Sequence, residues 1–148
     1  MEIRNMQPED VDAVSRLEQQ CFSDPWSRAQ LEEELENPDA CWLTAIEGDQ
    51  VLGYMGIRLM GPEADVMQVA VAPQARRQGI ARRLVQAMLE QCAGRGVERL
   101  MLEVRESNQP ARRLYEEMGF IEEGRRKKYY RQPVEDAVLM SWWKKGVG

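Results

Sequence analysis

The chain of 148 residues contains no histidine. Without imidazole it lacks the commonest general base, every Ser–His or Cys–His nucleophile pair, and the most frequent ligand of zinc and iron sites. Any acid–base chemistry must therefore use carboxylates, tyrosine, lysine, cysteine or water. We expect no metal site.

Long apolar runs are also absent, and cysteines are few. No stretch of about eighteen apolar residues occurs and the N-terminus is polar and acidic, so we expect neither a membrane span nor a signal peptide. The three cysteines, Cys21, Cys41 and Cys92, are odd in number and far apart. They are typical of buried free thiols in a reducing compartment, which predicts a cytoplasmic protein.

A formal net charge of −5 disfavours general nucleic-acid binding and permits a basic partner. The length fits one domain over residues 1–148 with a single core. Oligomeric state cannot be inferred from the sequence.

Periodicity and turn residues predict an α/β domain built around a mixed sheet. Ser27 and Gln30 have the spacing of a capping box, and Gly119 is placed to end a late helix. The residues from Arg99 to Val104 are almost continuously apolar, as in a central strand covered on both faces. The expected strands are 2–6, 41–46, 51–57, 66–71, 99–104, one from Phe120 and 137–143, with helices after Pro8, Ser27, Gly79 and Asn108.

The region from Val66 to Gln91 is the most informative one. A β-branched strand leads through a short turn into a helix whose apolar positions are Ile80, Leu84, Met88 and Cys92. Unpaired backbone N–H groups, the positive end of the helix dipole and arginine side chains meet at the helix start. This arrangement predicts an anion site for a ligand that carries phosphates. Taken alone, the same residues would also fit an arginine-rich, solvated helix start.

Two common phosphate loops do not match. No Gly-Lys-Ser/Thr occurs for a P-loop, and the turn has one glycine where a Rossmann motif needs three. The motif present is R-x-x-G-x-A, formed by residues 76–81. With the element order and the later Asn108…Leu114-Tyr115…Gly119-Phe120 pattern, it resembles the GNAT superfamily of acyl-CoA-dependent N-acetyltransferases over essentially the whole chain.

The resemblance implies a GNAT-like fold: a mixed, mostly antiparallel sheet with a splayed centre, flanked by helices. It implies acetyl-CoA as co-substrate and no metal. The pyrophosphate would bind the backbone amides of the loop, and the pantetheine arm would pair with the strand before it. The residues implied in coenzyme binding are Val69, Ala70, Val71, Arg76, Arg77, Gln78, Gly79, Ile80, Ala81, Arg82 and Asn108.

Several segments are similar to the bacterial RimI-type enzymes within that superfamily. They are 24–27 (Asp-Pro-Trp-Ser), 102–108, 128–130 and 135–140. This likeness implies that the acceptor is the N-terminal alanine of a small-subunit ribosomal protein. Two other functions stay open: acetylation of lysine side chains or of a small amine, and a non-catalytic acyl-CoA-binding module.

Two residues are candidates for catalysis by direct transfer. Glu103, at the end of its strand, is a candidate general base for the acceptor amine, or else a carboxylate in a surface salt bridge. Tyr115 is a candidate acid for the leaving thiolate, or a core tyrosine, and both descriptions can hold together. Asn108 is expected to cap its helix in either case.

Three further groups are weaker signals. The acidic residues 32–34 and 36 suggest a solvated helix face, or a surface that steers a basic acceptor. The basic run 125–128 suggests a solvated strand edge. Trp26, Tyr129 and Tyr130 are candidates for the wall of an acceptor pocket, or else aromatic residues that simply cover the core.

Overall fold

The computed structural model describes residues 1–147, so Gly148, part of the predicted domain range, lies outside the described residues. The element order matches the predicted one. The elements are β1 (Glu2–Asn5), η1 (Pro8–Asp10), α1 (Val11–Cys21), α2 (Arg28–Glu36), β2 (Ala40–Glu47), β3 (Gln50–Met60), β4 (Glu63–Val71), η2 (Pro73–Ala75), α3 (Ile80–Gly94), β5 (Arg99–Arg105), α4 (Gln109–Glu117), β6 (Ile121–Arg131) and β7 (Val134–Trp143).

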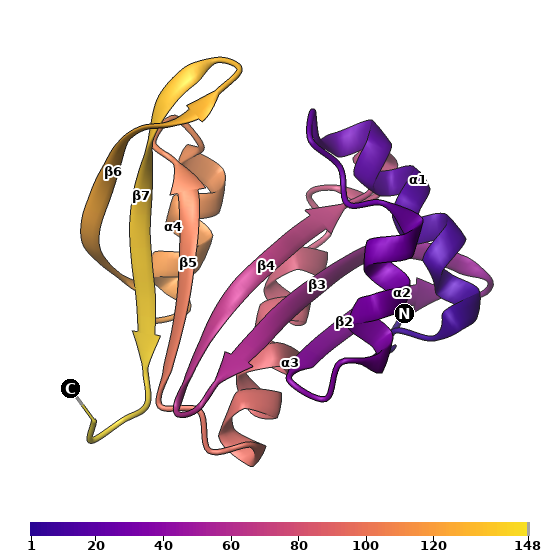
Figure 1. Ribbon diagram of the computed structural model, residues 1–148, viewed down its shortest axis with the longest axis horizontal. Coiled ribbons are helices and arrows are strands. Elements are labelled where there is room, and N and C mark those ends of the chain that lie inside the picture. Colours follow the sequence, from indigo (N-terminus) through magenta and orange to yellow (C-terminus); the bar gives the residue numbers. More distant parts are fainter. Residues whose placement is uncertain (148) are drawn as a thin grey trace.

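All seven strands form one sheet in the order β1-β2-β3-β4-β5-β7-β6. Every neighbouring pair is antiparallel except β4–β5, which is parallel. The β4–β5 pairing is short, because it covers only Glu63↔Arg99, Ala64↔Leu100 and Asp65↔Met101. Beyond these pairs the two strands diverge, and Figure 1 shows the resulting V between the two halves of the sheet. The predicted mixed sheet with a splayed centre is therefore confirmed.

Helices cover the sheet on both faces. α1 and α2 pack on one face of β2 and β3, and α3 packs on the opposite face (Figure 1). The buried side of α3 is formed by Ile80, Leu84, Val85, Met88 and Cys92, the predicted four-residue step with one addition. Burial of this apolar face, rather than helix propensity, is the main source of its stability.

Local signals at the helix ends behave as predicted. The Ser27 hydroxyl accepts from the Gln30 N–H at 3.1 Å, and the Gln30 side chain accepts from the Ser27 N–H at 2.8 Å. Asn108 caps α4 by accepting from the Ala111 N–H at 3.3 Å. These bonds satisfy backbone donors that the first helical turns leave free.

Three predictions need correction. β5 is not covered on both faces: Leu100, Leu102 and Val104 are buried while Glu103 is exposed, because the separation from β4 opens one face. β7 begins at Val134 rather than Ala137, so the β6–β7 turn is only two residues long. Cys21 is half-buried, whereas Cys41 and Cys92 are buried as expected.

The acidic face of α2 is only partly a solvated surface. Glu34 is buried and bonds the Arg58 guanidinium at 2.7 Å and the Trp42 indole N–H at 3.3 Å. A carboxylate with an arginine and an indole donor can be buried, and the local sequence does not reveal these distant partners. Within residues 1–147, no helix combines the length and apolar character needed to cross a bilayer.

Candidate active site

The edge of β4 that faces the V is available for pairing beyond Asp65. The Ala72 N–H donates to the Leu52 carbonyl of β3 at 2.8 Å. Since backbone groups alternate sides along a strand, Ala70 also points toward β3, and Val69 and Val71 direct their amides into the V. This is the edge on which the family resemblance implies an extended ligand chain.

A cavity of about 730 Å³ lies along this edge. Its wall contains predicted site residues from four separate parts of the sequence: β4, α3, β5 and the start and body of α4. They are Val69, Ala70, Val71, Ala81, Glu103, Asn108 and Tyr115. Phe22, Ser23 and Asp24 of the α1–α2 connection form part of its wall. Its size is in the range of sites that hold a cofactor-sized molecule.

A second cavity of about 540 Å³ is formed by β4, β5, β6 and β7, with Asp65, Arg99 and Ser141 in its wall. The two cavities share Gln68, Glu103, Tyr129 and Tyr130. Because the same four side chains border both, the cavities adjoin where β4 and β5 separate. Two reactants can therefore approach this position from different sides.

Glu103 lies at this junction with its side chain 30% exposed. Its carboxylate is 3.8 Å from the Arg126 guanidinium of β6. The charge of Glu103, followed by burial and a hydrogen bond to the same carboxylate, raises the pKa of Tyr129. Thus the predicted salt bridge exists, but it lies inside the junction, and the same carboxylate is open to a reactant.

Tyr115 is 5% exposed and packs its ring at 5.5 Å from that of Phe120. It also belongs to the wall of the larger cavity. Burial, and secondarily the proximity of Tyr130, raises the pKa of Tyr115 to about 12. The residue is thus a packed core tyrosine that borders the cavity and holds its proton at neutral pH.

The loop before α3 has the geometry of an anion site. Gly79 is the N-cap with φ 76°, and Arg77 has φ 66°. Ile80 is buried, so it presents only its backbone N–H to a ligand. The N–H groups at the start of α3 lack intrahelical acceptors. The predicted loop residues Arg76, Arg77, Gln78, Gly79, Ile80 and Arg82 lie outside the wall of the 730 Å³ cavity.

Two of the predicted arginines are engaged elsewhere in this structure. The Arg76 guanidinium donates to the Val71 carbonyl at 3.2 Å. Arg82 forms an ion pair with Glu117 of α4. A phosphate at the loop would have to compete for Arg82, whereas the backbone N–H groups are already in position.

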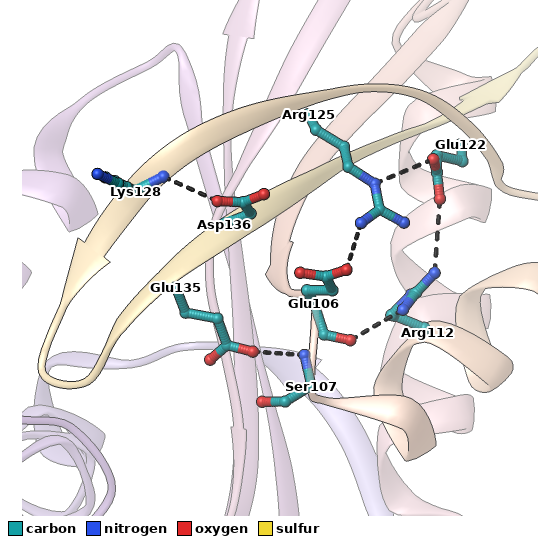
Figure 2. Close-up of polar contacts among 8 residues, drawn as sticks. All are labelled: Glu106, Ser107, Arg112, Glu122, Arg125, Lys128, Glu135 and Asp136. Atoms are coloured by element: carbon teal, nitrogen blue, oxygen red, sulfur yellow. Dashed lines mark hydrogen bonds and ion pairs between the residues drawn. The ribbon is translucent and has the colours of Figure 1, made fainter.

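The connection from β5 to α4 is fixed by the β6–β7 hairpin (Figure 2). Glu135 accepts from the Ser107 N–H at 2.5 Å, and Arg125 bonds Glu106 at 2.5 Å. The Arg112 guanidinium donates to the Glu106 carbonyl at 2.8 Å. The hairpin that carries Tyr129 and Tyr130 is therefore tied to the loop that carries Asn108.

Comparison with known proteins agrees with this geometry. The model of the acetyltransferase (GNAT) family matches residues 11–120. This chain belongs to the GNAT family. A Bacillus subtilis relative with the provisional name ribosomal protein bS18-alanine N-acetyltransferase is 37% identical over 93% of this chain and 92% of its own length.

The Haemophilus ducreyi ribosomal protein bS18-alanine N-acetyltransferase is 33% identical over 94% of this GNAT chain and 97% of its own length. The crystal structure of the ribosomal-protein-S18-alanine N-acetyltransferase from Escherichia coli has a TM-score of 0.89 and 29% identity. It covers 99% of this chain and 96% of that one. These similarities, with the family match, identify an acetyltransferase of RimI-like sequence and fold.

The residues of this GNAT chain fit a coenzyme A derivative. The β4 edge has free amides for an extended arm, and the α3 start has free N–H groups beside a glycine. A Cβ built on Gly79 would have no atom within 4 Å, so the space in front of the loop is open. Among residues 1–147 there is no group of three His, Cys, Asp or Glu side chains placed to hold a metal ion.

Sequence reasoning missed one polar cluster beside the site. The fully buried Glu18 of α1 bonds Gln68, which borders both cavities, at 3.1 Å. Trp26 follows the second of its two predicted descriptions and covers the core: its ring packs on Trp42 at 5.3 Å and its backbone N–H donates to Glu18 at 2.8 Å. Tyr129 and Tyr130 border both cavities. No short-range pattern links Glu18 with Gln68, since fifty residues separate them.

Proposed function

We propose that this chain is an acetyl-CoA-dependent N-α-acetyltransferase that acts on the N-terminal alanine of a small-subunit ribosomal protein. The observation that carries the proposal is that Glu103 and Tyr115 both border the cavity beside the free edge of β4. The names of the relatives supply the acceptor class. A binding module has no need of a base and an acid at this position.

The chain's own backbone would hold the coenzyme. The amides of Val69 and Val71 would pair with the pantetheine arm, and those from Gly79 to Ala81 would bind the pyrophosphate. Arg76, Arg77, Gln78 and Arg82 surround that loop. Asn108 uses its oxygen to cap α4, which leaves its side-chain N–H groups available to the arm.

The acceptor amine must lose a proton before or during attack. A free α-amino group has a pKa of roughly 8, so only about a tenth to a fifth is neutral near pH 7. Glu103, at the junction of the two cavities, accepts that proton directly or through water. The thioester carbonyl ends the arm that pairs with β4, so the hydrogen bond from the Val71 amide to the arm would be made at this carbonyl and would polarise it.

Tyr115 then donates its proton to the departing thiolate. A phenol of pKa about 12 is a weak acid toward a thiol whose ordinary pKa is near 8.5. Burial, however, raises the pKa of the thiol as well as that of the phenol, because it disfavours both anions. Proton transfer inside the cavity is therefore closer to balance than these values suggest.

Transfer is direct, without an acyl-enzyme, since none of the three cysteines lies in the wall of either cavity. Burial is the first cause that raises the pKa of Cys41 and of Cys92, to about 11 for Cys92, so both remain thiols. A thiol in this state is a poor nucleophile. Glu103 takes the ammonium proton, and the neutral amine attacks as the acetyl group passes from the coenzyme sulfur to the nitrogen. Tyr115 gives its proton to the sulfur, and the proton that the nitrogen loses after attack restores the Tyr115 phenol.

Thiol release from acetyl-CoA tests the acceptor with two peptides of the same sequence. One has a free N-terminal alanine followed by basic residues, and the other has a blocked N-terminus and an available lysine. We expect transfer to the first only. Transfer to the second would assign the enzyme to lysine acetylation, and tight acetyl-CoA binding without any transfer would favour a binding module.

Glu103→Gln and Tyr115→Phe test the catalytic roles. Each is expected to lower kcat about 10²-fold or more, the usual contribution of a positioned acid or base, while the Kd for acetyl-CoA stays within about twofold. Glu116→Gln is a matched control that should leave kcat unchanged, because it removes an exposed carboxylate next to Tyr115 that lies in neither cavity wall. Unchanged kcat in both site variants would refute the assigned roles.

A further inference from the structure

Glu18 is an unusual residue for the inside of a protein. Its side chain is fully buried, on the face of α1 that packs against the sheet. Its carboxylate accepts from three donors: the Trp26 N–H at 2.8 Å, the Gln68 amide at 3.1 Å and the Tyr54 hydroxyl at 2.5 Å. Burying a carboxylate is costly unless donors surround it, and these three satisfy that requirement.

The bond to Glu18 determines how the Gln68 amide is turned. A glutamine amide has an NH₂ group that only donates and an oxygen that only accepts, on opposite branches of one planar group. The Nε2 branch donates to Glu18, so the oxygen branch points away from that carboxylate. Gln68 is half-buried and borders both cavities, at the position where Glu103 lies.

We propose that the Gln68 carbonyl oxygen binds the acceptor's amino group, and that Glu18 is the positioning residue that turns this oxygen toward the amine. The inference rests on the proposed function, since it requires an amine acceptor at the junction of the two cavities. It adds a substrate-binding residue and a buried residue that acts through it.

The chemistry favours a neutral acceptor at this position. After Glu103 has taken one proton, the amine keeps two N–H groups and gains a lone pair for attack on the thioester carbonyl. An oxygen that accepts one of these N–H groups fixes the direction of the lone pair. An amide oxygen does so without competing for the proton, because unlike a carboxylate it is not a base near neutral pH.

Glu18 sets the orientation of the Gln68 amide, and a hydrogen bond from the Tyr54 hydroxyl fixes the Glu18 carboxylate in turn. Burial, with the Glu18 hydrogen bond as the next cause, raises the pKa of Tyr54, which keeps this hydroxyl a donor. The Trp26 N–H ties the same carboxylate to the connection between α1 and α2. That connection carries Phe22, Ser23 and Asp24 in the wall of the larger cavity.

The test is a double-mutant cycle on Gln68→Leu and Glu18→Gln, with steady-state kinetics on the alanine-headed peptide. Gln68→Leu keeps the size of the side chain and removes the oxygen. It is expected to raise the peptide KM at least about tenfold, as for loss of one hydrogen bond to a charged or reacting group. The Kd for acetyl-CoA should stay within about twofold.

Glu18→Gln is expected to raise the peptide KM several-fold, because an amide at position 18 can bond Gln68 in either orientation. In the Gln68→Leu background the same substitution should add less than about twofold, since the group through which it acts has gone. Glu34→Gln is the matched control: Glu34 is also a buried carboxylate with two donors, and it is absent from both cavity walls. It should lower Tm without changing the peptide KM.

The outcomes separate this inference from the proposed function. If the wild-type enzyme acetylates the peptide but Gln68→Leu leaves its KM unchanged, the inference is wrong and the function stands. If Glu18→Gln raises the peptide KM by the same factor in the wild-type and in the Gln68→Leu background, Glu18 does not act through Gln68 and its role is only structural. If Glu18→Gln does not fold, Gln68→Leu alone decides the oxygen's role.

Failure of the wild-type enzyme on the peptide would refute the proposed acceptor. The same variants are then compared on the lysine peptide or the small amine that the wild-type enzyme accepts, and the KM change again supports or refutes the inference. If no amine is accepted, both the function and the inference are wrong.

Discussion

At the residue scale, backbone conformation decides what can approach the start of α3. Gly79 adopts φ 76°, a left-handed conformation that costs other residues about 1 kcal/mol or more. The space in front of it is open in this structure. Glycine favours this conformation, and the proposed phosphate site would give a second reason for it, the close approach of the phosphate to the backbone. One substitution with a control separates the two reasons.

Gly79→Ala is expected to raise the KM for acetyl-CoA about tenfold or more, because a methyl group would stand between the phosphate and the backbone amides. Gly96→Ala is its control, since Gly96 has φ 74° and equally open surroundings at the other end of α3. Both variants should lose roughly 1 kcal/mol of stability from strain. An equal KM for acetyl-CoA in the two variants would contradict phosphate binding at this loop.

At the element scale, the β6–β7 hairpin depends on a few polar contacts to keep its position. Hydrogen bonds from Ser107, ahead of the Arg105 guanidinium, hold the pKa of Glu135 below its usual range. The Arg105 guanidinium also lies 4.3 Å from the centre of the Tyr130 ring. The hairpin places Tyr130 at the junction of the two cavities. The hydrogen bond from Ser107 to the ionised Glu135 helps to hold the hairpin there (Figure 2).

Glu135→Gln is expected to lower Tm by roughly 2–4 °C at pH 7. Because the folded-state pKa of Glu135 is lowered, its contribution is present above the unfolded value of about 4.3 and is lost as pH falls through the folded value. The difference from wild type, measured by thermal unfolding, should therefore shrink as the pH falls below about 4.3. Glu116→Gln, at an exposed position on α4, should show no such difference at any of these pH values.

The elements themselves could be predicted from the sequence because their signals are local. The Ser27–Gln30 capping box, the Asn108 cap and the four-residue step of α3 each depend on neighbours within a turn or two. The positions of Glu103 and Tyr115 beside one cavity followed from the family resemblance rather than from periodicity. The burial of Glu34 and of Glu18 could not be foreseen, because their partners Arg58, Tyr54 and Gln68 are distant in sequence.

At the scale of the whole molecule, the backbone pairing that joins the two halves of the sheet is short, from Glu63↔Arg99 to Asp65↔Met101. The larger cavity has walls from both halves, with Val69 on one side and Asn108 and Tyr115 on the other. A ligand in that cavity would contact both halves at once. Ligand binding should therefore stabilise the whole fold, by about 2.7 kcal/mol when acetyl-CoA is at 100 times its Kd.

Amide hydrogen exchange can detect the bound coenzyme on the free edge of β4. Without ligand, the amides of Val69 and Val71 point into the V and should exchange fast, while the Ala72 amide, bonded to Leu52, should exchange slowly. Acetyl-CoA should slow exchange at Val69 and Val71 about tenfold or more, because the pantetheine arm takes the place of a strand. Ala72 is the internal control and should slow far less. Equal slowing at all three positions would mean that the ligand only stabilises the fold globally, and pairing with β4 would be refuted.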